Sequence, residues 1–344
     1  MQPTTDTFTT LSKTMIAAVE TEMRSVLEAG DAPPDLFQGM MHYHMGWVDA
    51  DLRPAHIRSG KRIRPLLCLL CCHAAGGDWE QAVPAAAAIE ILHNFTLIHD
   101  DIQDDSPTRR GRPTLWTLWG VPQAINSGDA MFAAAHLALA RLLDNNVPAT
   151  AVVRALRRLD ETCMDLTRGQ YADMRFETRA NVSVDEYLEM IRGKTAVLIA
   201  LSAELGALVA GKDAQTIAHF AAFALNLGLA FQVRDDILGI WGEEAVIGKS
   251  AATDIVTRKK SLPVLYGLER SEALRQLYAA DPAPADFVPR AIALLDEAEA
   301  RPYAETQERA YTDLALGYLG EVAGIHHTSQ PLIHLTHQLL GRIS

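Results

Sequence analysis

The 344-residue sequence has few cysteines and no long apolar stretch free of charge. Three of its four cysteines, Cys68, Cys71 and Cys72, lie in one apolar segment and have no spaced partners elsewhere. Buried reduced thiols are therefore expected, rather than a disulfide framework or a zinc site. No run of about 18 uncharged apolar residues occurs, and the nearest candidate, 195–211, contains Glu204. We therefore expect no membrane-spanning helix or stable membrane anchor. Because the N-terminus also lacks the pattern of a signal peptide, a cytoplasmic location is expected.

Basic residues are also scarce. The sequence has 31 Lys and Arg against 43 Asp and Glu, which gives a formal net charge of -12. Nucleic-acid binding is therefore not expected, because attraction to phosphates requires a basic face. An acidic protein can still bind an anionic ligand where its few cations gather at one place, so local charge is more informative than the total.

Alternating strand-like patterns are scarce, and there is no fixed-period repeat, low-complexity linker or abrupt change of composition. Alanine and leucine instead recur with the spacing of a helix. The segments 81–104, 195–210 and 217–238 are apolar on most sides, as expected of helices in the middle of a bundle. The sequence predicts an all-α protein in which residues 1–344 form one domain, a single large helical bundle.

The first acidic motif comes directly after an apolar segment. It contains four carboxylates, Asp100, Asp101, Asp104 and Asp105. On a helix, Asp100 and Asp104 share one face, where like charges repel unless a cation lies between them. A solvated acidic helix end is the plainer interpretation, but it fits poorly with a helix that is otherwise apolar. The pattern favours a metal site.

A second apolar segment, 218–230, leads into another carboxylate pair, Asp235 and Asp236. If these two helices face each other at their acidic ends, their carboxylates form one oxygen-rich site. Mg2+ is commonly held by one or two carboxylates together with substrate phosphates. One Asp-Asp pair is weak evidence, whereas two pairs on two apolar helices point to a site for a metal and a diphosphate.

Basic residues are concentrated around these motifs. They are Lys61, Arg62, Arg64, Arg109, Arg110, Arg112, Lys194, Lys249, Lys259 and Lys260. Each one alone is more often a solvated surface charge. Beside carboxylates that require a metal, they indicate that two anionic groups are held together, because Arg and Lys are the usual partners of phosphate.

The motifs follow a specific order along the chain. They are Gly-Lys-Arg-x-Arg-Pro from residue 60, Asp-Asp-x-x-Asp from 100, Arg-Arg-Gly-Arg-Pro from 109, Lys-Thr from 194, Phe-Gln-x-x-Asp-Asp from 231 and Gly-Lys from 248. This order resembles the trans-isoprenyl diphosphate synthase (polyprenyl synthetase) family, most closely its short-chain geranylgeranyl and farnesyl members. The resemblance implies an isoprenoid synthase type of bundle with a central substrate cavity, and a homodimer. It also implies condensation of isopentenyl diphosphate with an allylic diphosphate, assisted by three Mg2+ ions that Mn2+ can replace.

The resemblance also implies a role for each matching position. Asp100, Asp104 and Asp235 would bind the metal, while Asp101 and Asp236 complete the two motifs. The allylic diphosphate would be contacted by Arg109, Lys194 and Lys259, with Lys249 in support. The diphosphate of isopentenyl diphosphate would be held by Lys61, Arg64, His93 and Arg110. Thr195 and Gln232 would lie beside the reacting carbons.

The second motif departs from the family's usual Asp-Asp-x-x-Asp, because its fifth place is Gly239. One carboxylate of the metal site is missing, yet activity is expected to survive because the first motif is intact. Phe95, five places before Asp100, is followed by the small Thr96, which resembles the geranylgeranyl (C20) type. A farnesyl or longer product and a non-catalytic regulatory subunit are the alternatives. The segment 242–260, rich in Gly, Ser and Lys, is the predicted lid.

Overall fold

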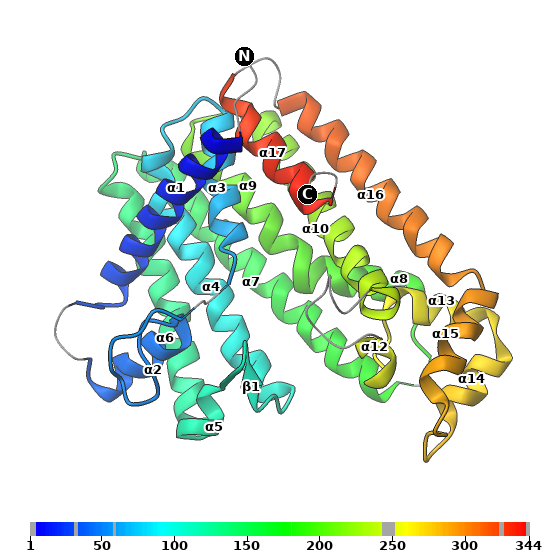
Figure 1. Cartoon of the computed structure of the whole chain (residues 1–344). Helices are drawn as coiled ribbons and strands as arrows, with labels where there is room; N and C mark the ends of the chain where they lie inside the picture. Colours follow the sequence, from blue (N-terminus) through cyan, green and yellow to red (C-terminus); the bar gives the residue numbers. More distant parts are fainter. Residues whose placement is uncertain are drawn as a thin grey trace. The chain divides into compact units, whose positions relative to one another are not determined.

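The computed structural model describes residues 5–30, 34–57, 60–179, 181–242, 252–322 and 327–341. These residues are predominantly helical, so the predicted all-α fold class is confirmed (Figure 1). The α-helices are α1 (Thr5–Val26), α2 (Leu36–Met45), α3 (Ile63–Ala74), α4 (Val83–Gln103), α5 (Leu115–Trp119), α6 (Val121–Ala140), α7 (Ala149–Thr178), α8 (Val184–Ile191), α9 (Val197–Val209), α10 (Ala214–Trp241), α12 (Thr253–Val256), α13 (Leu262–Arg270), α14 (Glu272–Ala279), α15 (Phe287–Glu297), α16 (Ala300–Val322) and α17 (Gln330–Leu339).

The remaining elements are short. They are the 3₁₀ turns η1 (Trp79–Ala82), η2 (Arg141–Leu143) and η4 (His327–Ser329), the π-helical turn η3 (Arg192–Ala196), and the strands β1 (Thr108–Arg109) and β2 (Arg112–Pro113). The two strands pair as an antiparallel hairpin, which the sequence did not predict.

The chain forms two compact units. The first unit comprises Met1–Asp160, Leu201–Ala218 and Val322–Leu335, and the second comprises Glu161–Ala200, His219–Glu321 and Thr336–Ser344. The first acidic motif lies in the first unit, and the second acidic motif lies in the second unit. That the whole chain forms one domain, with one central cavity, stays a prediction.

The first unit is built around α4, in which the successive alanines 85–88 are completely buried. Such small side chains let neighbouring helices approach closely. Helix α4 packs most extensively against α6, and also against α3 and α1 (Figure 1). At one contact, a Cβ added to Gly128 of α6 would lie 2.2 Å from Nε2 of His99, so only glycine leaves room for this ring. The end of α4 that carries the first acidic motif is thereby packed firmly against α6.

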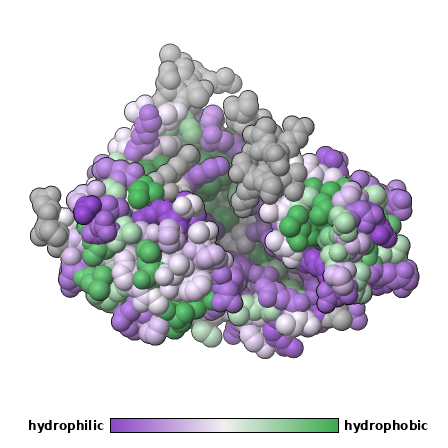
Figure 2. Space-filling view, turned by 60° about the horizontal axis from the view of Figure 1, so that its bottom comes forward, coloured by the Kyte–Doolittle hydropathy of each residue, from purple (hydrophilic) through white to green (hydrophobic). Residues whose placement is uncertain are grey.

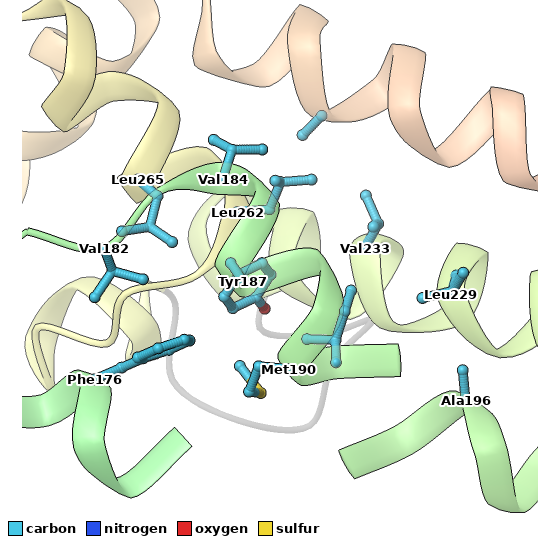
Figure 3. Packing of buried hydrophobic residues seen from close by; sticks show 12 residues of the cluster. Phe176, Val182, Val184, Tyr187, Met190, Ala196, Leu229, Val233, Leu262 and Leu265 are labelled. Carbon is cyan, nitrogen blue, oxygen red and sulfur yellow. The ribbon is translucent and has the colours of Figure 1, made fainter. Parts of the chain in front are cut away.

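The second unit has a core of side chains from α7, α8, α10 and α13 (Figure 3). Tyr187 of α8 is fully buried in this cluster, close to Phe176, Met190 and Leu262. Val233 of α10 belongs to the same cluster. This core connects α8 and the π-helical turn with the part of α10 that carries the second acidic motif.

Helix α10 is, among the described helices, the one that is long and apolar enough to cross a membrane. Half of its most apolar window is buried inside the protein, and a buried core helix passes the same test. The sequence had pointed instead to 195–211, where the structure has the end of η3 followed by α9. Figure 2 shows hydrophilic and hydrophobic residues interspersed on the face in view. The four cysteines are buried and free of disulfides, as predicted.

Candidate active site

The first acidic motif lies at the C-terminal end of α4. The helix closes at Asp104, whose backbone N–H donates to the carbonyl oxygen of Asp100 at 2.8 Å. Asp105 then takes a left-handed conformation with φ 47°, and the chain turns into the hairpin. Asp100 is half-buried and Asp104 is exposed, and their spacing of one helical turn puts both on one face. This pair is therefore accessible to a ligand.

Asp101 differs from these two neighbours because it points into the protein. Its side chain is only 3% exposed and accepts a hydrogen bond of 2.7 Å from Nε of Arg109. Burial raises the pKa of the Asp101 carboxyl, and the Arg109 guanidinium opposes that rise. Asp101 therefore holds Arg109 in place instead of joining the accessible carboxylates.

The hairpin after this motif presents its arginines in different directions. The two residues between its strands, Arg110 and Gly111, both have positive φ, 53° and 76°, as a type I′ turn requires. The Arg110 guanidinium lies against Gly60, where an added Cβ would be 3.2 Å from Nη2. Arg112 donates from Nη1 and Nη2 to the carbonyl oxygens of Tyr43 and Val48, both at 3.0 Å. The sequence analysis counted Arg112 among the cations near the acidic motifs. In the structure its guanidinium instead anchors the hairpin.

Two arginines and a histidine gather beside the hairpin in the first unit. Nη1 of Arg64 donates to Nε2 of His93 at 3.2 Å. Burial lowers the pKa of His93 well below its usual value, and the positive charges of Arg64, Arg110 and Arg109 lower it further. The structure therefore brings together three of the four residues predicted for one diphosphate. The fourth, Lys61, is exposed just before α3.

A buried ion pair fixes the segment that carries these cations. Arg62 adopts a left-handed conformation with φ 50° and is buried, unlike Lys61 beside it. Its Nη1 donates to Glu90 of α4 at 2.6 Å, and its Nη2 donates to Glu20 of α1 at 3.3 Å. Asn94 also donates to Oε1 of Glu90, at 3.2 Å. The sequence did not reveal this anchor, because Arg62 looks like one more cation of the motif.

In the second unit, Lys194 lies in the π-helical turn and forms an ion pair with Asp173 of α7. The two segments touch closely, since a Cβ on Gly169 would lie 2.2 Å from the backbone nitrogen of Lys194. π-helical turns often occur at functional sites. Asp173 was missed by sequence reasoning, because it lies outside the two acidic motifs.

Thr195 is connected to the second acidic motif by side-chain hydrogen bonds. Its hydroxyl donates to Oε1 of Gln232 at 3.1 Å, and Nε2 of Gln232 donates to Oδ1 of Asp236 at 3.2 Å. Asp236 is 1% exposed and also accepts from the Tyr187 hydroxyl at 2.5 Å and from the Leu262 backbone N–H at 3.2 Å. Burial raises the pKa of Asp236 to about 6. Asp236 therefore orients Gln232 and, through it, Thr195.

Asp235, next to it, is exposed on α10 and remains the candidate metal ligand of this motif. Lys259 is exposed as well, and its charge lowers the pKa of Asp236 against the larger effect of burial. Lys249 lies outside the described residues, as does the part of the predicted lid from 243 to 251.

Phe95 is half-buried on α4 and contacts aromatic rings on two helices. Its ring centroid lies 4.8 Å from that of His99 on the same helix and 5.3 Å from that of Phe132 on α6. Phe132 in turn lies 4.7 Å from the ring of His136. Phe95 is thus one part of an aromatic layer shared by α4 and α6.

The structure holds two pockets near these residues. In the first unit, a pocket of about 30 Å³ is lined by Asp101, Arg109 and Arg110 among others. In the second unit, a pocket of about 420 Å³ lies between α7 and the segment formed by α8 and η3. None of the predicted site residues is among the described residues that line the larger pocket.

Across the described residues, no three His, Cys, Asp or Glu side chains gather into a preformed metal site. The candidate ligands nevertheless have suitable chemistry, because Asp100, Asp104 and Asp235 offer only carboxylate oxygens. Mg2+ prefers such oxygens and usually takes its remaining ligands from phosphates and water. Each of these aspartates, taken by itself, therefore offers a ligand that suits Mg2+ bound together with a diphosphate.

Comparison with known proteins decides the family. A model described as polyprenyl synthetase matches residues 48–295. The chain belongs to this family. As a polyprenyl synthetase it is a trans-isoprenyl diphosphate synthase, that is, a prenyltransferase, and its family is metal-dependent.

Individual relatives agree with this assignment. The synthetase is 48% identical to a geranylgeranyl diphosphate synthase of Mycobacterium tuberculosis, over 74% of this chain and 73% of that protein. It is 46% identical to a (2E,6E)-farnesyl diphosphate synthase of Mycobacterium bovis, over 66% of this chain and 62%, less than two thirds, of that protein. The crystal structure of a polyprenyl synthetase from Streptomyces coelicolor has a TM-score of 0.86 and 35% identity, covering 96% of this chain and 99% of that one.

Proposed function

We propose that this polyprenyl synthetase condenses isopentenyl diphosphate with an allylic diphosphate and releases mainly geranylgeranyl diphosphate (C20). One observation carries the proposal: the first unit holds Arg64 and Arg110, with the neutral His93 beside them, together with the accessible pair Asp100 and Asp104. Two anionic substrates need both features, because one diphosphate is bound by cations and the other is bound through a metal. The names of the geranylgeranyl and farnesyl relatives support the same chemistry.

The site residues have different proposed roles in binding the metal and the allylic diphosphate. Asp100, Asp104 and Asp235 would hold Mg2+, which when bound would neutralise charge on the allylic diphosphate and so make it a better leaving group. Arg109 in the first unit and Lys194 in the second are proposed to bind the allylic diphosphate, and each is already held by a carboxylate of its own unit, Asp101 and Asp173 respectively. Positioned charges of this kind stabilise negative charge as it develops on a departing oxygen.

The carbon chemistry begins with this departure. As the carbon–oxygen bond breaks, the allylic carbon becomes cationic and is attacked by the double bond of isopentenyl diphosphate. Loss of a proton from the new unit restores a double bond, and the departed diphosphate is the proposed base. Thr195 and Gln232 are proposed to lie beside the reacting carbons, where their oxygens, fixed by their mutual hydrogen bond, would favour positive charge.

We further propose that about three Mg2+ ions, or Mn2+ in their place, act with the substrates, and that the protein is a cytoplasmic homodimer. Activity should disappear in EDTA and return with either ion. Sedimentation of the purified protein measures the oligomeric state directly.

Incubation of the purified protein with labelled isopentenyl diphosphate and each allylic starter tests the main proposal. The expected result is turnover by this protein alone, with C20 as the principal chain length. Mainly C15 or longer products would replace the C20 assignment by one of its alternatives. No turnover with any starter would favour the regulatory subunit.

Product length also tests the role of the aromatic layer on α4 and α6. Phe95→Ala should shift the products toward C25 or longer, because the growing apolar chain then meets a smaller barrier below Asp100. Thr96→Phe should shorten them toward C15 by adding bulk one residue closer to the motif. Chain-length analysis of both variants is the measurement. If Phe95→Ala leaves the distribution unchanged in a folded, active enzyme, Phe132 is the next residue of the layer to replace.

A further inference from the structure

The second acidic motif lacks its last carboxylate, since Gly239 stands at that place. On α10, Gly239 comes four residues after Asp235 and so lies on the same face one turn later. A carboxylate at position 239 would be the natural second oxygen donor beside Asp235. The structure shows which group takes up that space instead.

The carboxyl group of Asp254 lies where a side chain at position 239 would begin. A Cβ added to Gly239 would be 2.6 Å from Oδ2, 2.7 Å from Cγ and 3.0 Å from Oδ1 of Asp254. Non-bonded atoms do not approach a Cβ this closely, so an aspartate at 239 would require the carboxyl group of Asp254 to move from its present position. Both residues belong to the second unit.

Helix α12, although short, is anchored so that Asp254 is presented toward α10. Ile255 is fully buried in a cluster that also contains Ile240 of α10. The backbone carbonyl oxygen of Asp254 accepts a 2.8 Å hydrogen bond from the N–H of Lys259. The negative charge of Asp254 also contributes to the raised pKa of Tyr187, whose hydroxyl donates to Asp236. The Asp254 carboxylate therefore lies close to the second motif.

We propose that Asp254 supplies, from α12, the carboxylate that α10 lacks at position 239, and that it binds Mg2+ together with Asp235. The inference rests on the proposed metal-dependent function and assigns one more residue to that site. It explains how the motif can lose its last aspartate without losing an oxygen donor: the glycine removes a side chain, and the second carboxylate enters the vacated space.

Metal binding provides a test that does not depend on turnover. Mn2+ binding is measured by electron paramagnetic resonance in the presence of inorganic pyrophosphate, for the wild type and for Asp254→Asn, which keeps the shape and removes the charge. We expect Asp254→Asn to weaken Mn2+ binding by at least about tenfold. Asp313→Asn, on the exposed face of α16 in the same unit, is the matched control and should bind as the wild type does.

A reciprocal exchange separates a metal ligand from a residue that only fills space. Gly239→Asp alone should lower both Tm and Mn2+ affinity, because the new side chain collides with Asp254. Adding Asp254→Ala to Gly239→Asp should restore both, since the usual motif is then rebuilt on α10. Recovery of Tm without recovery of Mn2+ affinity would overturn the inference, and so would an Asp254→Asn variant that binds Mn2+ as the wild type does. A wild type that binds no Mn2+ with pyrophosphate would instead contradict the proposed function itself.

Discussion

Asp101 in the first unit and Asp236 in the second occupy the same place in their motifs, yet they are held by different partners. Both are almost completely buried. Asp101 is paired with the cation Arg109, whereas Asp236 accepts hydrogen bonds from the neutral groups of Tyr187, Gln232 and Leu262. In each motif the first aspartate stays accessible and the second organises a neighbour that is itself predicted to act on substrate.

This difference in partners has an electrostatic consequence. The free-energy cost of burying a charged carboxylate is offset by a neighbouring cation. Dipoles alone offset this cost less completely. Lys259 is a charge that acts on Asp236, but burial prevails and the pKa rises to about 6. Replacing the buried aspartate by asparagine should therefore change the free energy of unfolding by different amounts in the two units.

The largest expected effect is the loss of activity when an accessible aspartate, rather than a buried one, is replaced. Asp100→Ala should reduce kcat/KM by at least about 100-fold, because a group that stabilises the departing diphosphate is lost. Its Tm should hardly change, because Asp100 is at the accessible end of α4. Steady-state kinetics and thermal unfolding of the same preparation measure both quantities. If Asp100→Ala had normal kinetics, the idea that the accessible aspartate acts on substrate would be wrong.

The next effect compares the two buried aspartates directly. Asp101→Asn should lower the free energy of unfolding by about 2 kcal/mol, because Arg109 loses its charged acceptor. Asp236→Asn should change it by less than about 1 kcal/mol at pH 7, because an amide can still accept from Tyr187 and Leu262. Denaturant unfolding of both variants gives the numbers. Equal losses would show that the partners do not matter.

The last comparison concerns the pH dependence of stability, which should have opposite signs in the two units. Burial lowers the pKa of His44 to about 3, so its contribution to stability is present above pH 6.5 and is lost as the pH falls. The raised pKa of Asp236 means that its contribution is present below about pH 4 and is lost as the pH rises through about 6.

Unfolding free energies measured in EDTA between pH 4 and 8 test both signs. Relative to His44→Asn, the wild type should lose about 1.4 kcal/mol per pH unit below pH 6.5. Relative to Asp236→Asn, it should lose stability in the other direction, as the pH rises from about 4 to about 6. Two differences of the same sign would contradict the proposed contrast.

Much of the fold and part of the site could be predicted from sequence. Helices α4 and α10 were recognisable because an unbroken apolar segment has to be buried and because each segment leads into an acidic pair, although α10 continues past its pair to Trp241. The motifs pointed to Arg64 and Arg110, and the family resemblance added His93; the structure brings these three residues together. These successes depend on local pattern and on resemblance.

The misses have a common physical cause, which is that adjacent residues of one type can face opposite environments. Successive side chains on a helix point about 100° apart, so Asp100 and Asp101 cannot share a direction. Which of the two faces inward depends on Arg109, beyond the end of the helix. The burial of Arg62 likewise depends on Glu90 and Glu20, which are distant in sequence. Pair spacing alone does not contain this information.

The π-helical turn at Arg192–Ala196 determines how this region can tolerate changes of length. A π turn holds one residue more than an α-helical turn, and here it lets the adjacent Lys194 and Thr195 reach two different helices, α7 and α10. Deleting one residue would restore an ordinary helix and rotate α9 relative to α8 by about 100°. Substitutions at Arg192 leave these contacts in place, whereas a deletion within the turn breaks them. In evolution and in engineering, this segment can change its composition but must keep its length.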